Sequence, residues 1–203
     1  MFWFETAAAV VSALGVWLMA RRRPLAWPVG LVSVLAYGWI FIDNRLYSDA
    51  LLQGAFAVMI VYGWWGWQRH LEDDGRVRPV PLARLPALRH LALGVAGALL
   101  LGAFMHHRTD AALPWLDAAL AAGSLVAQWW QARRHTAAWW LWIVVDVVYV
   151  GMYLHKHLFV TATLYVGFVA IAVAGLRAWQ HAAGPDRPRG DASLPVTGEP
   201  PTD

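Results

Sequence analysis

The sequence predicts an all-α membrane protein with seven transmembrane helices, arranged as a 3+1+3 parallel pseudo-repeat. Only 14% of the 203 residues are charged and 59% are hydrophobic, whereas a soluble domain carries about 25% charged residues. Several apolar runs reach roughly 18 residues, the length that a helix needs to cross about 30 Å of hydrocarbon. In addition, the first part of the chain recurs in the second part at a spacing of 112 residues.

The apolar runs place the elements in order. We expect helices over residues 3–20, 25–42, 46–67, 88–105, 113–131, 137–154 and 158–179. The first run has its arginines after it, so it is a first span and not a cleaved signal peptide. The stretch Gln68–Pro86 is polar and carries Pro and Arg, which is typical of a connection. Residues His181–Asp203 hold several Pro and Gly and few apolar groups, which indicates a disordered cytoplasmic tail.

The basic residues predict the orientation. With these helices, 13 of the 16 Arg and Lys residues fall on one side of the membrane. The other side holds only Arg45, Arg108 and Lys156. Since cytoplasmic loops carry the excess of positive charge, we expect the N-terminus outside and the C-terminus in the cytoplasm.

The internal repeat explains the odd number of helices. At a spacing of 112, Trp27 matches Trp139, Tyr37 matches Tyr149, and Arg21-Arg22 matches Arg133-Arg134. Both Arg pairs follow the first helix of a three-helix unit and both belong in the cytoplasm, so the units must be parallel. Helix 88–105 is the extra span that this requires. We therefore predict a first repeat over 1–67, a connection and linker helix over 68–112, and a second repeat over 113–180. Parallel repeats with a substrate near the midplane are a transporter design.

An acidic residue in the sixth helix marks the candidate site. Trp139, Trp142, Asp146, Tyr149 and Tyr153 are spaced by 3, 4, 3 and 4 residues, so they share one helical face. Asp146 stands where the first repeat has a valine. A charge at a helix centre costs about 3 kcal/mol and commonly serves function. The alternative is a structural acid paired with a buried hydroxyl.

Further polar and aromatic residues complete the predicted substrate site. Their side chains add amide and hydroxyl groups from the fifth and seventh helices and from the first repeat: Gln128, Ser124, Thr163, Gln53 and Tyr37. Aromatic faces attract cations by roughly 0.5–2 kcal/mol. The set therefore suits a small, flat, partly polar and cationic ligand.

Other functions find less support in the sequence. Without cysteine there is no disulfide and no thiolate metal site. The only lysine, Lys156, lies in a loop, which excludes a retinal protein. No nucleotide-binding motif is present and we expect no cofactor. The basic residues flank apolar runs, which suits a membrane surface better than nucleic acid. A membrane enzyme or metal protein using His106, His107, His155 and His157 stays a remote alternative.

Three segments resemble the PnuC family of vitamin transporters. They read LGVWLMARRRPLAWPVGLVSVLAYGWIF, LYSDALLQGAFAVMIVYGWWGW and WLDAALAAGSLVAQWWQARRHTAAWWLWIVVDVV. The resemblance covers residues 3–180. Its most specific element is the family pattern W-x-x-W-x-x-x-N, which corresponds here to Trp139, Trp142 and Asp146. Aspartate thus replaces the usual asparagine.

The resemblance implies a function and a fold. It implies import of nicotinamide riboside across the bacterial inner membrane by facilitated diffusion and alternating access, with trapping by a cytoplasmic kinase. It also implies a homotrimer, a fold like that of full-length SWEET sugar transporters, and a substrate ring held among the aromatic and amide groups named above. Because an acid suits any cationic ring, thiamine stays open as a substrate, and relatives with this fold also carry riboflavin.

Overall fold

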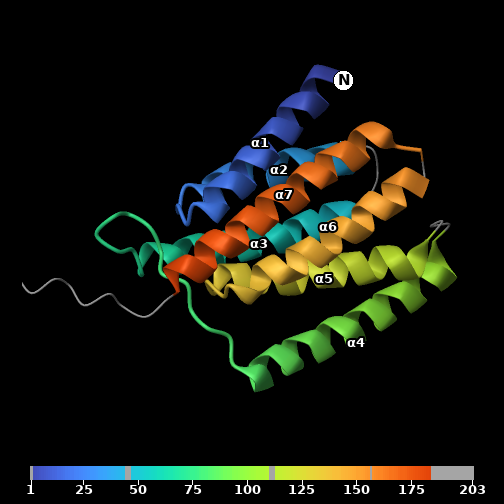
Figure 1. Ribbon diagram of the computed structural model, residues 1–203. Helices are drawn as coiled ribbons and strands as arrows, with labels where there is room; N and C mark the ends of the chain where they lie inside the picture. The colour runs from blue at the N-terminus through green and yellow to red at the C-terminus, as the bar shows by residue number, and fades with distance from the viewer. Residues whose placement is uncertain (1, 44–46, 110–112, 156, 184–203) are drawn as a thin grey trace, which may run out of the picture.

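A computed structural model of the chain contains seven α-helices and describes residues 2–43, 47–109, 113–155 and 157–183 (Figure 1). The helices are α1 (Phe2–Ala20), α2 (Ala26–Asp43), α3 (Tyr47–Gln68), α4 (Arg84–Arg108), α5 (Pro114–Ala132), α6 (Ala137–His155) and α7 (Phe159–Ala182). Each predicted helix is therefore found.

The bounds differ from the prediction mainly at α4. This helix begins at Arg84, four residues before the predicted start at 88, and so takes in Pro86. Proline is tolerated there because the N–H groups of a first helical turn have no partner within the helix. At the other end of the chain α7 continues to Ala182. The remainder of the predicted disordered tail, 184–203, lies outside the described residues.

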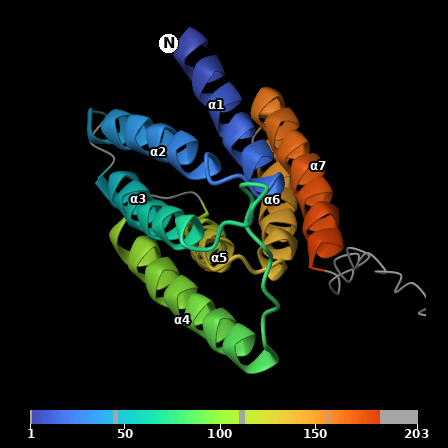
Figure 2. The same ribbon diagram turned by 90° about the vertical axis from the view of Figure 1, so that its left-hand side faces the viewer.

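Six of the helices form a closed ring. α1 packs on α2, α2 on α3, α3 on α5, α5 on α6 and α6 on α7, and α7 returns to α1 (Figure 2). The fourth helix, α4, lies outside this ring and packs against α5 alone among the described helices (Figure 1). Its role as a connector between two repeats stays a prediction.

Five of the seven helices are long and apolar enough to cross a membrane: α2, α3, α4, α6 and α7. For α1 the described side chains begin at Val10, so its apolar stretch Val10–Ala20 is not counted among the five. The other exception, α5, has the polar residues Asp117, Ser124, Gln128 and Gln131 among its 19 residues, which lowers its hydropathy. Since α5 is packed against α3, α4 and α6, much of it is covered by protein.

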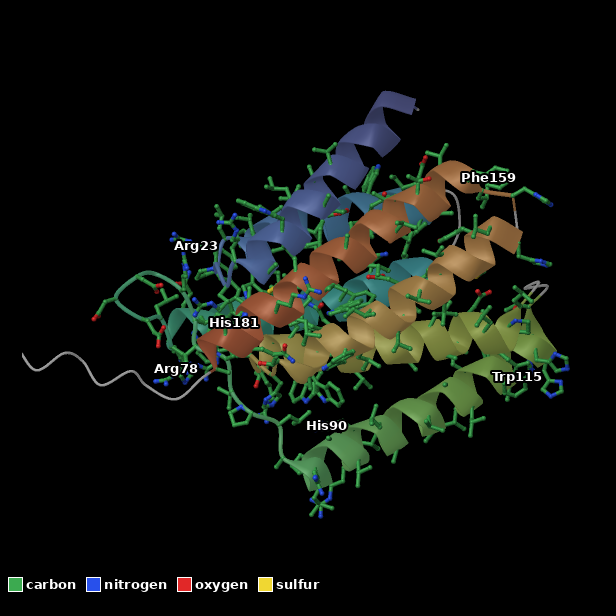
Figure 3. The ribbon with its side chains drawn as sticks, viewed as in Figure 1. Arg23, Arg78, His90, Trp115, Phe159 and His181 are labelled. Atoms are coloured by element: carbon green, nitrogen blue, oxygen red, sulfur yellow. The ribbon has the colours of Figure 1, made fainter. Side chains whose placement is uncertain are left out.

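The arginines gather at one end of the bundle. Arg23 and Arg78 lie near His181 at this end, and Trp115 and Phe159 lie at the opposite end (Figure 3). Among the described basic residues, the arginine-rich end has all the arginines except Arg108, which closes α4. Arg45 and Lys156 lie outside the described residues.

The arginine-rich end contains contacts that recur 112 residues apart. Trp67 Nε1 donates to the carbonyl of Gln131 at 3.3 Å, and Trp179 Nε1 donates to the carbonyl of Met19 at 3.2 Å. Donors and acceptors are both related by the spacing of 112. Each bond joins one predicted repeat to the other. The rings of Trp67 and Trp179 themselves meet between the two halves, with centroids 5.8 Å apart.

The connection between α3 and α4 ties the two halves together at the same end. Arg22 and Arg134, again 112 residues apart, both have positive φ, at 60° and 64°. Val77 N donates to the carbonyl of Arg22 at 3.2 Å, and Val80 N donates to the carbonyl of Arg134 at 2.9 Å. One short segment therefore binds equivalent turns of both halves. The division at 67, 112 and 180 stays a prediction, which these paired contacts support.

Candidate substrate-binding site

The predicted face of α6 points into the ring of helices. Trp139 and Asp146 are 1% and 8% exposed, and Trp142, Tyr149 and Tyr153 are half-buried. On the other face Trp140, Val144 and Val147 are 53–58% exposed. Because the helix is amphipathic in this sense, its acid and aromatic groups are withdrawn from the lipid-facing surface.

Asp146 is the one charged side chain that is buried among the described residues. It lies halfway along α6, next to Val145, which packs with Leu120 and Met152. Its carboxyl interacts electrostatically with the phenol groups of Tyr149 and Tyr165. A buried carboxylate needs a hydrogen-bonded or cationic partner to offset its lost hydration. The surroundings of Asp146 are therefore suited to receive a cation.

Three tyrosines form a cluster on the side of Asp146 that is away from the arginine-rich end. Tyr165 of α7 lies between the two tyrosines of α6, with ring centroids 4.8 Å from Tyr149 and 5.2 Å from Tyr153. Tyr165 also stacks edge-on against Phe168 of its own helix, with centroids 5.5 Å apart. The predicted residues Tyr149 and Tyr153 are thus brought together, with ring centroids 5.8 Å apart. The ring of Tyr37 in the other half lies near that of Phe41, at 6.1 Å, and its predicted contact with substrate stays a prediction.

Tyr165 was not among the predicted site residues. A signal for it exists in the repeat, because Tyr165 lies 112 residues after the candidate Gln53. Gln53 lies half-buried on α3, and its Cβ would be in contact with a Cβ added to Gly38 of α2. Gln53 therefore lies at the packed α2–α3 contact of its own half, as Tyr165 does at the α6–α7 contact.

Trp139 lies at the arginine-rich end of the face and has a packing partner. A Cβ added to Gly175 would lie 2.8 Å from its ring, and its centroid is 5.7 Å from that of Trp179. Trp27 has the same position against Gly63 and Trp67. These four tryptophans (Trp27, Trp67, Trp139 and Trp179) are each at most 1% exposed, and we call them the tryptophan cluster. Packing therefore accounts for Trp139, and its predicted contact with substrate stays a prediction.

The polar residues of α5 are withdrawn from the surface to different degrees. Ser124 is 7% exposed and Gln128 is half-buried. In the first half Ser12 hydrogen-bonds Ser33 at 3.1 Å; Val145 stands in place of Ser33 in the second half, so Ser124 lacks that partner. One turn further on, Gln131 is 2% exposed, and neither its amide nitrogen nor its amide oxygen has a hydrogen-bond partner.

The structure does not bring Thr163 into the buried group. Its side chain is exposed, and its hydroxyl donates to the carbonyl of Phe159 at 2.9 Å, one turn back in the same helix. Threonine hydroxyls commonly bond in this way within helices.

The metal-site alternative finds no support in the described part of the chain. No group of three His, Asp or Glu residues lies close enough there to hold a metal ion. The ring of His106 instead lies near those of His107 and Trp115, at 5.1 and 6.2 Å.

Known proteins resemble this chain over most of its length. The model of a family described as nicotinamide mononucleotide transporter matches residues 2–181. The chain is 25% identical over 217 residues to the nicotinamide riboside transporter PnuC of Escherichia coli (strain K12), covering 95% of this chain and 90% of that protein. It is 30% identical over 185 residues to the riboflavin/roseoflavin transporter RibM of Streptomyces davaonensis, covering 88% and 85%.

A solved structure supports the fold. The crystal structure of the vitamin B3 transporter PnuC superimposes with a TM-score of 0.74 at 24% identity, covering 89% of this chain and 82% of that one. The all-α, seven-helix fold predicted from the sequence is confirmed, as is the resemblance to the PnuC family.

Proposed function

Because the chain belongs to the nicotinamide mononucleotide transporter family, which is a family of transporters and not of enzymes, we propose that it imports nicotinamide riboside. The observation that carries this proposal is the buried Asp146 on an aromatic face inside the ring of helices. The named substrate of the Escherichia coli relative supports it further.

The chemistry of nicotinamide riboside fits this face. Its pyridinium ring is flat and positively charged, so it gains from a carboxylate and from aromatic faces. Its carboxamide offers N–H donors that Asp146 accepts, and charged hydrogen bonds of this kind are stronger than neutral ones. Its ribose hydroxyls match the amide and hydroxyl groups of Gln128 and Ser124.

The closed arginine-rich end fits alternating access. The tryptophan cluster fills the ring of helices at that end, below Asp146, and the segment with Val77 and Val80 ties the two halves there. Import then requires the two halves to separate at this end while the opposite end, toward Tyr149, Tyr153 and Tyr165, closes. The flux needs no coupled ion if a cytoplasmic kinase phosphorylates the product, because the added negative charge prevents its return through an acid-lined site.

The finer topology belongs to the same proposal. The arginine-rich end faces the cytoplasm of a bacterial inner membrane, since positive charge favours the inner side, and the N-terminus then lies outside. The two halves are parallel repeats as in full-length SWEET proteins. The assembly is a homotrimer in the lipid bilayer.

A second substrate class follows from one comparison. The relative that is 30% identical is named for riboflavin and roseoflavin. The isoalloxazine ring of riboflavin is flat but carries no positive charge, so Asp146 favours cationic nicotinamide riboside or thiamine over riboflavin.

Uptake into proteoliposomes tests the proposal. The purified full-length chain is offered radiolabelled nicotinamide riboside, thiamine and riboflavin in separate reactions. We expect uptake of nicotinamide riboside above the other two, and a loss of at least about tenfold in affinity for Trp142→Ala. Trp140→Ala, on the exposed face of the same helix, is the matched control and should transport normally. Preferred uptake of thiamine or riboflavin, or equal effects of both substitutions, would refute the assignment.

A further inference from the structure

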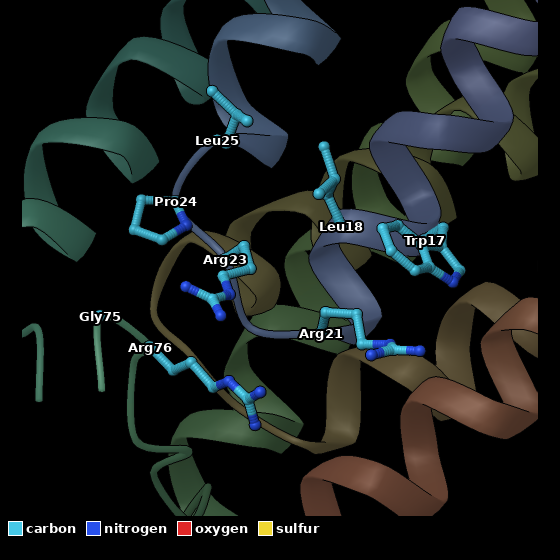
Figure 4. Close-up of a pocket in the computed structure, with 8 residues that line it drawn as sticks. All are labelled: Trp17, Leu18, Arg21, Arg23, Pro24, Leu25, Gly75 and Arg76. Carbon is cyan, nitrogen blue, oxygen red and sulfur yellow. The ribbon is translucent and has the colours of Figure 1, made fainter.

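A cavity lies at the arginine-rich end, away from the face of Asp146. It has a volume of about 500 Å³ and lies where the turn between α1 and α2 meets the connection between α3 and α4 (Figure 4). Three arginines line it: Arg21 and Arg23 from the turn, and Arg76 from the connection. No acidic residue is among its lining residues. The cavity is therefore electropositive.

The arginines are held in place by local structure. Gly75, with a φ of +69°, turns the connection back, and Gly75 N donates to the carbonyl of Glu72 at 2.9 Å. This turn brings the backbone close to Arg23, whose Nη1 would be 3.6 Å from a Cβ on Gly75. The guanidinium of Arg21 lies over the ring of Trp17, 4.7 Å from its centroid.

Most of this positive charge is not neutralised by the protein. Arg76 Nε lies 3.6 Å from Asp74 Oδ2. Arg21 and Arg23 form no ion pair with any described residue. A ligand with a single negative charge can therefore bind two guanidinium groups, which recognise phosphate oxygens through paired N–H donors.

The other side of the cavity is apolar. Leu18 and Leu25 lie opposite the arginines in Figure 4. Leu25 is 61% exposed and Trp17 is 44% exposed; Leu25 ends the α1–α2 turn and Trp17 lies in the last turn of α1. Tryptophan at such a helix end is typical of the membrane–water interface. An electropositive cavity with one apolar, lipid-facing wall matches a molecule with an anionic head and an acyl chain.

In the second half of the molecule, different side chains surround the position equivalent to Arg21. Arg133 lies over Trp129, at 4.9 Å, as Arg21 lies over Trp17. There, however, Tyr62 stacks on Trp129 with centroids 5.3 Å apart. The equivalent of Arg23 is His135, whose Nδ1 donates to the carbonyl of Val80 at 3.1 Å. Arg133 thus has the same aromatic neighbour as Arg21 but different surroundings, which provides a matched control.

We propose that this cavity binds the phosphate of an anionic phospholipid, with Arg21 and Arg23 as its principal ligands and Arg76 beside them. Basic pockets at the ends of transmembrane helices bind lipid head groups in this way. The bound lipid joins the α1–α2 turn to the α3–α4 connection at the end of the bundle that the tryptophan cluster closes. A zwitterionic lipid is disfavoured because its cationic group would lie among the arginines.

Native mass spectrometry of the full-length protein in detergent tests this proposal. The probes are phosphatidylglycerol and phosphatidylcholine with identical acyl chains. We expect preferential retention of phosphatidylglycerol by the wild-type chain, and a drop of about tenfold in the double variant Arg21→Gln, Arg23→Gln. Arg133→Gln, the equivalent position in the other half, should retain phosphatidylglycerol like wild type. The double variant Arg21→Lys, Arg23→Lys keeps the charge and should retain most of the binding.

Several results would overturn the assignment. Equal retention of the two lipids by wild type would do so, as would an equal loss in Arg133→Gln. Displacement of phosphatidylglycerol by inorganic phosphate or glycerol 3-phosphate at the same concentration would make the ligand a free anion and not a lipid. If the Arg21→Gln, Arg23→Gln variant does not fold, the wild type and the lysine variant test the proposal instead. Retention of phosphatidylglycerol must then fall with rising salt in both proteins.

Discussion

At the scale of single residues, the side chain of Asp146 can contribute to ligand binding in two ways. Its carboxylate offers both a negative charge and acceptor oxygens, whereas asparagine at the same place offers a carbonyl acceptor without charge. The family pattern has asparagine at this position. The aspartate of this chain is therefore expected to add affinity for a cation, on top of a hydrogen bond that both residues can accept.

The substitution Asp146→Asn tests how much the negative charge contributes to binding. Affinity for nicotinamide riboside should fall about fivefold to tenfold, because hydrogen bonds to a charged group are about 1 kcal/mol stronger than neutral ones. Affinity for the reduced, uncharged dihydropyridine form of the same nucleoside should fall less, because that form keeps the carboxamide donor but has no positive charge for the carboxylate to attract. Isothermal titration of both ligands on both proteins measures this difference, and an equal loss for the two ligands would contradict a role for charge.

The residue scale also shows what sequence reasoning could reach. The 3-4-3-4 spacing on α6 was sufficient to predict an inward face, since a helix places those positions on one side. It could not predict Tyr165, because that residue belongs to another helix and meets Tyr149 only after α6 and α7 have packed. Nor could spacing predict that Thr163 bonds to its own helix, because this depends on the side-chain rotamer.

At the scale of elements, two glycines determine how closely α2 approaches α3 and α6 approaches α7. A Cβ on Gly63 would lie 2.4 Å from Trp27, and one on Gly175 would lie 2.8 Å from Trp139. Small residues at such crossings let membrane helices approach each other closely. The space beside the two glycines is filled by Trp27 and Trp139.

Alanine at either glycine should destabilise the protein. Forcing a methyl group against a packed indole costs about 1–3 kcal/mol, so Gly63→Ala and Gly175→Ala should unfold at lower temperature in detergent. The matched controls are Gly66→Ala in α3 and Gly167→Ala in α7, where a Cβ would meet nothing within 4 Å. Thermal melts that did not distinguish the two pairs would show that the tryptophan cluster tolerates the added methyl group.

The turn between α5 and α6 should make stability depend on pH. Burial lowers the pKa of His135, and the positive charges of Arg133 and Arg134 and the neighbouring His90 lower it further. The hydrogen bond to the Val80 carbonyl raises the pKa but does not cancel this decrease. The unfolded chain therefore binds a proton more readily than the folded one. Stability is then lost as pH falls below about 6.5, the ordinary pKa of histidine.

Replacement of the imidazole checks this dependence. His135→Asn keeps a donor for the Val80 carbonyl but cannot titrate, so its melting temperature should change less between pH 8 and pH 6 than that of wild type. The same pH slope in both proteins would locate the titrating group elsewhere.

At the scale of the whole molecule, the closed ring explains how similar halves can hold one asymmetric site. Equivalent tryptophans, glycines and turns recur at a spacing of 112 and form the frame. The polar groups are added on one side only, where Asp146 replaces the counterpart of Val34. The repeat could be detected from the sequence, but the closing contacts of α3 with α5 and of α1 with α7 could not, because they join residues far apart in the chain.

Transport by this architecture should not depend on a proton gradient. Asp146 is the one buried charge among the described residues, so the buried interior there contains no second acid that could relay a proton. Uptake of nicotinamide riboside into proteoliposomes should proceed at the same rate with and without an imposed pH gradient. An initial rate that followed the gradient would contradict uniport.

The central claim is that the ring of helices receives a cationic vitamin at Asp146. A calorimetric titration of nicotinamide riboside into wild type, Asp146→Ala and Val34→Ala tests it most directly, because Val34 is the equivalent position in the other half. The account predicts at least a tenfold loss of affinity for Asp146→Ala, with Val34→Ala close to wild type. Unchanged binding in Asp146→Ala, measured on folded protein, would contradict it.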